Sequence, residues 1–172
     1  MNAVWCKIQC MRILGIDPGY AIMGYGIVEY RGSKFTPVEY GAITTEAHTP
    51  NEERLMIIYD ELTRIIDEFK PECASVEELF YNTNATTAIM VGEARGTVLL
   101  ACAKAGIPIS EYTPLQIKSA LTGYGKAEKQ QVQAMVKMIL GLPEVPKPDD
   151  TADALAAAIC HAHHAGGRMP SE

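Results

Sequence analysis

Residues 12–20 read RILGIDPGY, and the rest of the chain is best understood from this stretch. The apolar run from Ile13 to Ile16 ends at Asp17 and a Pro-Gly turn, a pattern typical of a strand that is covered on both faces. A carboxylate at the end of such a strand is costly unless a cation, a proton or several hydrogen-bond donors satisfy it. Asp17 is therefore either a cap for the turn, which is common for Asp before Pro-Gly, or one member of a larger group of acids.

The charge of the chain is unevenly distributed. With 172 residues and a net charge of −6, the chain is long enough for one domain with a sizeable core, and it is too acidic for a general nucleic-acid coat. Residues 95–140, however, contain six basic and two acidic side chains, so this segment carries +4 and the remainder carries −10. This distribution suits a protein that binds an anion on one face and a metal in an acidic pocket, although ordinary solvated helix surface has the same pattern.

Cysteine usage and the two ends of the chain indicate its compartment. Five scattered cysteines are typical of core residues in a reducing environment, and the spacing of Cys6 and Cys10 does not suit zinc. No apolar run reaches the roughly 18 residues of a membrane span, and the first ten residues lack the features of a secretory signal. We expect a cytoplasmic protein with one domain at 11–165, a disordered extension at 1–10 and a flexible tail at 166–172.

The order of the predicted elements indicates an α/β fold, in which helices flank a five-stranded mixed sheet. β-branched and aromatic residues predict strands at 22–30 and 35–45, which form a meander with the first strand. Apolar periodicity and short apolar runs predict the remaining elements. In chain order these are a helix at 51–69, a strand at 73–76, a helix at 84–105, a strand at 107–112 and helices at 114–121, 127–140 and 150–165.

Acidic residues lie where these elements would bring them together. The helix at 51–69 makes a crossover connection, which should place the next strand parallel to the first and bring Glu77 or Glu78 near Asp17. Asp150 and Asp153 are three residues apart and share one face of the last helix, whose many alanines indicate close packing. Both could instead cap that helix, because acids favour its free N–H groups and its dipole.

A group of crowded carboxylates has a clear chemical meaning. Such groups repel one another unless cations are bound. Hard oxygen ligands select Mg²⁺ or Mn²⁺. Two such ions, about 3.5 to 4 Å apart, can activate a water and stabilise the leaving oxygen when a phosphodiester is hydrolysed. The acids therefore predict a nuclease with two metal ions in each active site.

Five segments of the chain resemble the successive motifs of the RuvC family of Holliday-junction resolvases, in the order of that family. They are ILGIDPG at 13–19, SVEELF at 75–80, GEARG at 92–96, YGKAEK at 124–129 and DTADALA at 150–156. The resemblance implies a ribonuclease H-like fold, a homodimer and a Mg²⁺-dependent endodeoxyribonuclease that cuts two opposed strands of a four-way DNA junction in recombination and repair. It also implies branch-migration partners of the RuvA and RuvB type.

The resemblance also assigns roles to individual residues. It places catalysis and metal binding at four acids, Asp17, Glu77, Asp150 and Asp153. Glu77 is preferred to Glu78 because the acid of the family follows the apolar residue directly. Three residues match DNA-contacting positions: Lys118 and Lys129 match basic positions that support cleavage, and Phe80 matches an aromatic residue that stacks on bases near the crossover.

Small residues suggest where other groups approach the chain. Gly24 and Gly26 leave the backbone near Asp17 open to a ligand, unless they serve the geometry of the turn alone. The helix at 84–105 carries a stripe of small residues that would let another helix approach closely: Ala85, Ala88, Gly92 and Gly96. The partner of this stripe is either the rest of the domain or a second copy of the chain.

Two other functions fit parts of the sequence. One is a ribonuclease H-like nuclease that acts on another nucleic acid, such as the RNA of a hybrid. The other is a fragment of an actin-like phosphate-binding ATPase, because these proteins also begin with an apolar strand, an Asp and a glycine-containing hairpin. An ATPase of that class needs a second comparable domain, and 172 residues are too few to supply one.

Overall fold

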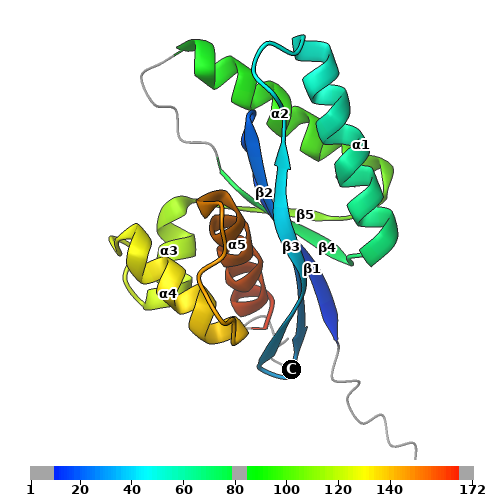
Figure 1. The fold of residues 1–172 in the computed structure, drawn as a ribbon. Helices are drawn as coiled ribbons and strands as arrows, with labels where there is room; N and C mark the ends of the chain where they lie inside the picture. The colour runs from blue at the N-terminus through cyan, green and yellow to red at the C-terminus, as the bar shows by residue number, and fades with distance from the viewer. Residues whose placement is uncertain (1–9, 79–84, 167–172) are drawn as a thin grey trace, which may run out of the picture.

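The structure is a computed structural model that describes residues 10–78 and 85–166. It contains the expected five-stranded mixed sheet, in the strand order β3-β2-β1-β4-β5 (Figure 1). The elements are β1 (Met11–Asp17), β2 (Ile22–Arg31), β3 (Lys34–Thr44), α1 (Asn51–Phe69), β4 (Cys73–Glu77), α2 (Ala85–Lys104), β5 (Ile109–Tyr112), α3 (Pro114–Thr122), α4 (Lys129–Leu140) and α5 (Asp149–Gly166). Most of the extension expected at 1–10 (residues 1–9), most of the tail expected at 166–172 (residues 167–172) and the DNA contact expected at Phe80 lie outside the described residues.

Each predicted strand and helix is found close to its expected position, and the largest shifts, of two residues, are at the starts of β5 and α4. This helix begins at Lys129, two residues later than the sequence predicted. Glu128 is its N-cap, and the side chains of Glu128 and Gln131 each bind the backbone of the other in a capping box. Such a box satisfies free N–H groups of the first turn and so fixes where the helix starts.

The strand register places two acids side by side. Strand β1 runs antiparallel to β2 and parallel to β4, and Ile16 of β1 pairs with Val76 of β4. Asp17 and Glu77 each follow one residue later, at the carboxyl ends of these neighbouring strands. The parallel pairing predicted from the crossover helix is therefore present.

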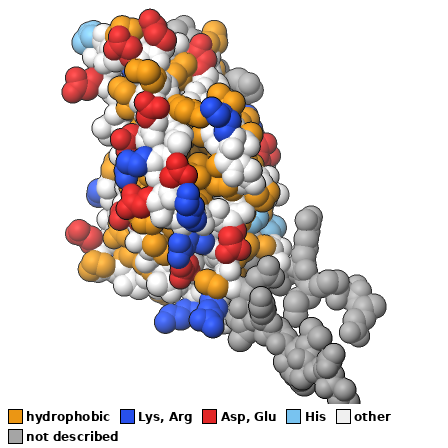
Figure 2. All heavy atoms as spheres, turned by 90° about the vertical axis from the view of Figure 1, so that its right-hand side faces the viewer, with side chains coloured by type: hydrophobic (Ala, Val, Ile, Leu, Met, Phe, Trp, Pro, Cys, Tyr) orange, Lys and Arg blue, Asp and Glu red, His pale blue; other side chains and the backbone are white. Residues whose placement is uncertain are grey.

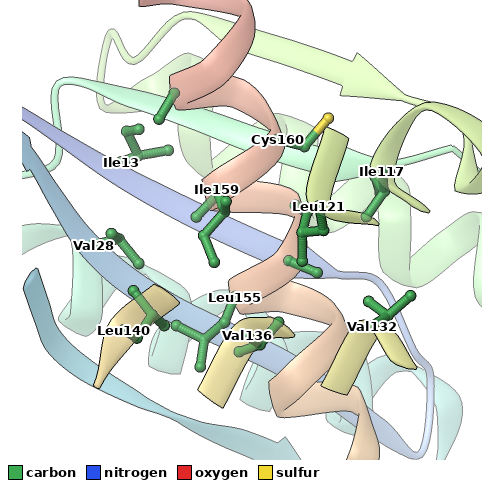
Figure 3. Packing of buried hydrophobic residues seen from close by; sticks show 14 of the residues in the cluster. Ile13, Val28, Ile117, Leu121, Val132, Val136, Leu140, Leu155, Ile159 and Cys160 are labelled. Carbon is green, nitrogen blue, oxygen red and sulfur yellow. The ribbon is translucent and has the colours of Figure 1, made fainter. Parts of the chain in front are cut away.

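Helices cover both faces of the sheet and create two hydrophobic clusters. Helices α1 and α2 lie on one face, and α3, α4 and α5 lie on the other (Figure 1). Figure 3 shows Leu155 and Ile159 of α5 between the sheet residues Ile13 and Val28 and the helices α3 and α4. Because all four side chains are fully buried, they anchor α5 against the strands that carry Asp17 and Glu77.

Glycines of the sheet allow the backbone of α5 to come unusually close. A Cβ atom on Gly24 would lie 1.9 Å from the carbonyl oxygen of Asp150, and one on Gly15 would lie 2.0 Å from that of Ala154. A Cβ on Gly26 would overlap the Leu155 side chain at 2.5 Å. Gly24 and Gly26 therefore make room for α5, and the prediction that they leave space for a ligand is wrong.

One face of α2 has no partner within the described part of the chain. Nothing lies within 4 Å of the Cβ position of Gly92 or Gly96, while Ala94 and Val98 on the opposite face are buried. Ile89 and Leu100 extend the open face, with exposed fractions of 64% and 55%. Within residues 10–78 and 85–166, then, Gly92 and Gly96 do not pack against the rest of the domain.

Two surface properties bear on function. Within residues 10–78 and 85–166, none of the helices combines the length and apolarity needed to cross a bilayer. Figure 2 shows hydrophobic side chains interspersed with acidic and basic ones on the side of the molecule where α1 lies in Figure 1. That side therefore presents no uniformly basic surface.

Candidate active site

Asp17 is the centre of the candidate site. Its carboxylate is partly buried at the end of β1, and burial raises its pKa to about 8. Repulsion from Glu77, Asp153 and Asp150 acts in the same direction, in that order of strength. The other three acids singled out in the sequence therefore all act electrostatically on Asp17, as expected for crowded carboxylates.

Glu77 has a similar environment at the end of β4. Burial, followed by repulsion from Asp153, raises its pKa to about 7, while Lys118 and Lys129 oppose the shift. Its neighbour Glu78 lies beyond the strand, and the Glu78 backbone N–H donates to the Tyr112 carbonyl at 2.9 Å. The structure thus separates Glu77, which lies beside Asp17, from Glu78, a choice that the strand pattern alone left open.

Helix α5 brings the remaining two acids to the ends of the strands. Asp150 lies in its first turn, and its backbone packs over Gly24 of β2. Burial raises the pKa of Asp153, although a hydrogen bond from Lys129 counteracts the shift. The distance from Lys129 Nζ to Asp153 Oδ2 is 3.0 Å, so the described partner of this carboxylate is a lysine on α4.

Two buried hydroxyl groups hold α5 in place, and neither was singled out in the sequence. The Ser75 hydroxyl, in the middle of β4, donates to the Ala157 carbonyl at 2.7 Å. The Thr151 hydroxyl donates to the Gly41 carbonyl of β3 at 3.0 Å. Only the sequence context of Thr151, between two of the acids, gave any signal of its importance.

Asp149 is a further acid that the sequence interpretation passed over. Its carboxylate accepts a hydrogen bond from Lys147 Nζ at 2.6 Å and lies 3.5 Å from Lys129 Nζ. The hydrogen bond from Lys147 lowers the pKa of Asp149. Asp149 is therefore a surface ion-pair partner at the start of α5, in contrast to Asp17 and Glu77, whose pKa values are raised.

A pocket of about 190 Å³ lies beside these acids. The end of β4 and the helices α3, α4 and α5 form its walls, which are lined by Glu77, Pro114, Ile117, Lys118, Lys129, Val132, Asp153 and Ala156. Two acids and two lysines therefore face a small space with partly apolar walls. In such surroundings charges interact more strongly than in open water.

The chemistry of the acids suits a hard divalent cation. Four carboxylates supply oxygen donors, and burial together with mutual repulsion raises the pKa values of Asp17 and Glu77, a combination that a bound cation would relieve. As the side chains stand, no three His, Cys, Asp or Glu residues of the described ranges form a group that could hold a metal ion. Lys129 binds Asp153 through Oδ2, and because a carboxylate has two oxygens, this contact is compatible with Asp153 acting as a ligand through Oδ1.

Comparison with known proteins decides the family. The family model described as "Crossover junction endodeoxyribonuclease RuvC" matches residues 13–161. The chain belongs to the RuvC family. It is 61% identical over 153 residues to crossover junction endodeoxyribonuclease RuvC of Desulfitobacterium hafniense strain DCB-2, which covers 89% of this chain and 93% of that protein. It is 57% identical over 162 residues to the protein of that name from Desulforamulus reducens, which covers 92% and 99% of the two chains.

Solved structures agree with the RuvC assignment. A Thermus thermophilus RuvC in complex with a Holliday junction substrate matches with a TM-score of 0.85 and 37% identity, over 92% of this chain and 97% of that one. The yeast mitochondrial Holliday junction resolvase Ydc2 matches with a TM-score of 0.63 and 14% identity, over 89% and 79% of the two chains, which shows a shared fold. The ribonuclease H-like fold expected from the sequence is confirmed, and neither alternative function is favoured.

Proposed function

We propose that this RuvC-family chain resolves four-way DNA junctions by hydrolysing phosphodiester bonds in two opposed strands. The main support for the proposal is that Asp17 and Glu77 lie side by side at the ends of parallel strands. Asp153 acts electrostatically on Asp17, and Glu77 and Asp153 line a pocket together with two lysines. Family membership and the Thermus RuvC bound to a Holliday junction substrate support the choice of DNA substrate.

We propose that two Mg²⁺ ions, with Mn²⁺ as the alternative, bind at Asp17, Glu77, Asp150 and Asp153. When bound, such ions supply a nucleophilic water at neutral pH and stabilise the leaving oxygen. The protein contributes placement, because β1 and β4 fix Asp17 and Glu77 while the contacts of Ser75 and Thr151 fix α5. Lys118 and Lys129 place positive charge at the pocket, where a scissile phosphate develops negative charge during cleavage.

The proposal includes a two-fold dimer through the open face of α2. A four-way junction presents two strands for symmetric cutting, so one site in each of two subunits matches its symmetry. Gly92 and Gly96 would permit close helix contact, and the exposed Ile89 and Leu100 would be buried there. A cytoplasmic location and branch-migration partners of the RuvA and RuvB type belong to the same proposal.

Cleavage of end-labelled four-way junctions, with and without Mg²⁺, tests the proposed function. We expect paired cuts in two opposed strands that require the metal. RNA–DNA hybrids and linear duplexes serve as comparison substrates. Cleavage of hybrids in preference to junctions would reassign the chain to another nucleic-acid substrate.

The stability of the metal-free protein should depend on the crowded acids. The pKa values of Asp17 and Glu77 are raised from 3.8 to about 8 and from 4.5 to about 7, so the folded protein holds protons that the unfolded chain has released. Its stability without metal must then fall as the pH rises from 3.8 to about 8. Asp17→Asn should therefore raise the free energy of unfolding at pH 8 by roughly 1 to 3 kcal/mol, less than the full shift because the group is only partly buried.

Thermal melts in EDTA at pH 5 and pH 8 measure this effect. A gain of that size raises Tm by about 2 to 4 °C per kcal/mol for a chain of this length. Mg²⁺ should stabilise the wild type more than Asp17→Asn, since only the wild type keeps all four acids. Equal dependence of Tm on pH in the two proteins would refute the electrostatic account.

The two lysines of the pocket should support the chemical step. Lys118→Ala and Lys129→Ala remove positive charge near the scissile phosphate, so each should slow cutting by roughly 10- to 1,000-fold. Single-turnover rates at protein concentrations far above the dissociation constant separate chemistry from binding. Lys137→Ala, at the far end of α4, is the control for loss of a lysine. If both pocket variants match this control in rate and salt dependence, the assignment fails.

A further inference from the structure

The turn between α3 and α4 presents an aromatic side chain that the proposed chemistry does not use. This α3–α4 turn, residues 122–127, contains Tyr124, which is 59% exposed. Leu115 of α3 is 60% exposed and packs against the turn, because a Cβ atom on Gly125 would lie 2.9 Å from Leu115 Cγ. The apolar parts of Tyr124 and Leu115 are thus exposed to water. Pro114, the residue before Leu115, lines the acid pocket.

Hydrogen bonds fix the backbone that carries this ring. The Thr122 hydroxyl oxygen accepts from the Tyr124 N–H at 3.2 Å and lies 3.0 Å from the Tyr124 carbonyl. That carbonyl also accepts from the Ala127 N–H at 3.1 Å. Gly123 ends α3 in the left-handed conformation, with φ of 73°. The position of Tyr124 is therefore set by the fold, which lowers the entropy cost of using its ring to bind a partner.

Lysines lie before and after Tyr124 along the chain and indicate the chemistry of that partner. Lys118 and Lys129 line the acid pocket, on the helices before and after the turn, and Lys126 lies exposed within the turn itself. Among the described residues, neither Lys118 nor Lys126 takes part in an ion pair. An aromatic ring with cations on both sides along the chain is the arrangement by which proteins bind unpaired nucleic-acid strands, with a base on the ring and phosphates on the cations.

We propose that Tyr124 stacks on an unpaired base of the junction, next to the phosphate that is cut, and that Lys126 binds a flanking phosphate. This inference rests on the proposed function, because it supposes that DNA reaches the acid pocket. The turn then positions the DNA strand. The scissile phosphate of that strand would lie beside Lys118 and the acids. Tyr124 is a DNA-contacting residue here and takes no part in the chemical step.

Binding of a four-way junction by the full-length protein in EDTA gives the first test. Tyr124→Ala should weaken binding by about 5- to 100-fold, the usual range for loss of one stacked base, while Tyr124→Phe keeps the ring and should bind like the wild type. Lys126→Gln should lower the slope of log affinity against log salt by about one phosphate contact. Met138→Ala, which shortens a 71% exposed apolar side chain at the other end of α4, is the control and should have no effect.

A fluorescence signal distinguishes stacking from an indirect structural effect. The chain has a single tryptophan, Trp5, so Tyr124→Trp in a Trp5→Phe background carries one reporter at the proposed contact. This reporter protein should bind like the wild type, and its tryptophan emission should be quenched when junction is added. Thermal melts of each variant show whether the fold is retained.

The outcomes separate this inference from the proposed function. If the wild type neither binds nor cuts junctions, the proposed function fails and the inference fails with it. If the wild type cuts junctions, but Tyr124→Ala binds as Met138→Ala does and DNA leaves the emission of the reporter protein unchanged, only the inference is overturned.

Discussion

Asp17→Asn should reduce junction cleavage by roughly 1,000-fold or more, the scale on which loss of one preorganised charged group affects a rate, while junction binding stays nearly unchanged. Binding depends mainly on phosphate contacts, whereas Asp17 lies at the point where the fields of the other three acids meet. Glu77→Gln, Asp150→Asn and Asp153→Asn should behave in the same way. Cleavage at saturating Mg²⁺ and binding in EDTA are the two measurements.

The neighbour of Glu77 supplies a matched control for this prediction. Glu78→Gln makes the same chemical change one residue further along, where the backbone bonds to Tyr112 beyond the end of β4. It should retain cleavage within about threefold of the wild type, as is usual for a surface substitution. Near-normal cutting by any of the four acid variants, or a loss in Glu78→Gln as large as in Glu77→Gln, would contradict the assignment of the acids.

Gly96→Leu should weaken the proposed dimer and abolish coordinated cutting without touching an acid. The new side chain meets nothing within the described part of the chain, so the monomer should fold at least as well, because leucine favours helix more than glycine does. In a close helix contact, the same side chain costs about 1 to 3 kcal/mol by overpacking, or about 5- to 150-fold in dissociation constant. A single subunit should then cut only one strand of a supercoiled cruciform plasmid. The plasmid should be nicked and should no longer be linearised in one binding event.

Sedimentation measures the dimer, and Ala134→Leu provides the comparison. Ala134 is an exposed small residue in the middle of α4, on the other side of the sheet, so the same enlargement there should leave both mass and paired cutting intact. If Gly96→Leu still sediments as a dimer and linearises the plasmid like Ala134→Leu, the dimer uses a different surface.

The sheet and the meeting of the acids could be predicted because both follow from local patterns. Apolar runs mark the strands, and the handedness of a crossover connection leaves one position for β4, beside β1. Asp17 and Glu77 come directly after those runs, so their proximity required no knowledge of side-chain packing. The position of α5 was indicated only by its alanines, which show that a helix packs closely without showing against which strand.

The sequence did not reveal contacts that depend on which face of a helix or strand a residue occupies. Gly24 and Gly92 look alike in the sequence, yet Gly24 lies beneath the backbone of α5, while no atom of the described residues lies within 4 Å of the Cβ position of Gly92. Ser75 sits in an apolar strand and reads as a neutral core residue until the Ala157 carbonyl is placed beside it. The start of α4 depended on reciprocal hydrogen bonds in which the side chains of Glu128 and Gln131 each bind the backbone of the other residue, which a polar stretch does not specify by itself.

The contact of α5 with Gly15 and Gly24 makes the candidate active site sensitive to substitution at these two glycines. At these two points the atoms of one main chain rest directly on those of another, and a methyl group would already overlap a carbonyl oxygen. Two stretches of main chain cannot approach further than this, so a side chain at Gly15 or Gly24 must push α5 away from the sheet. Because α5 carries Asp150 and Asp153 and β1 ends at Asp17, such a shift would change the spacing of the acids, and the two glycines thus set the seat on which that spacing depends.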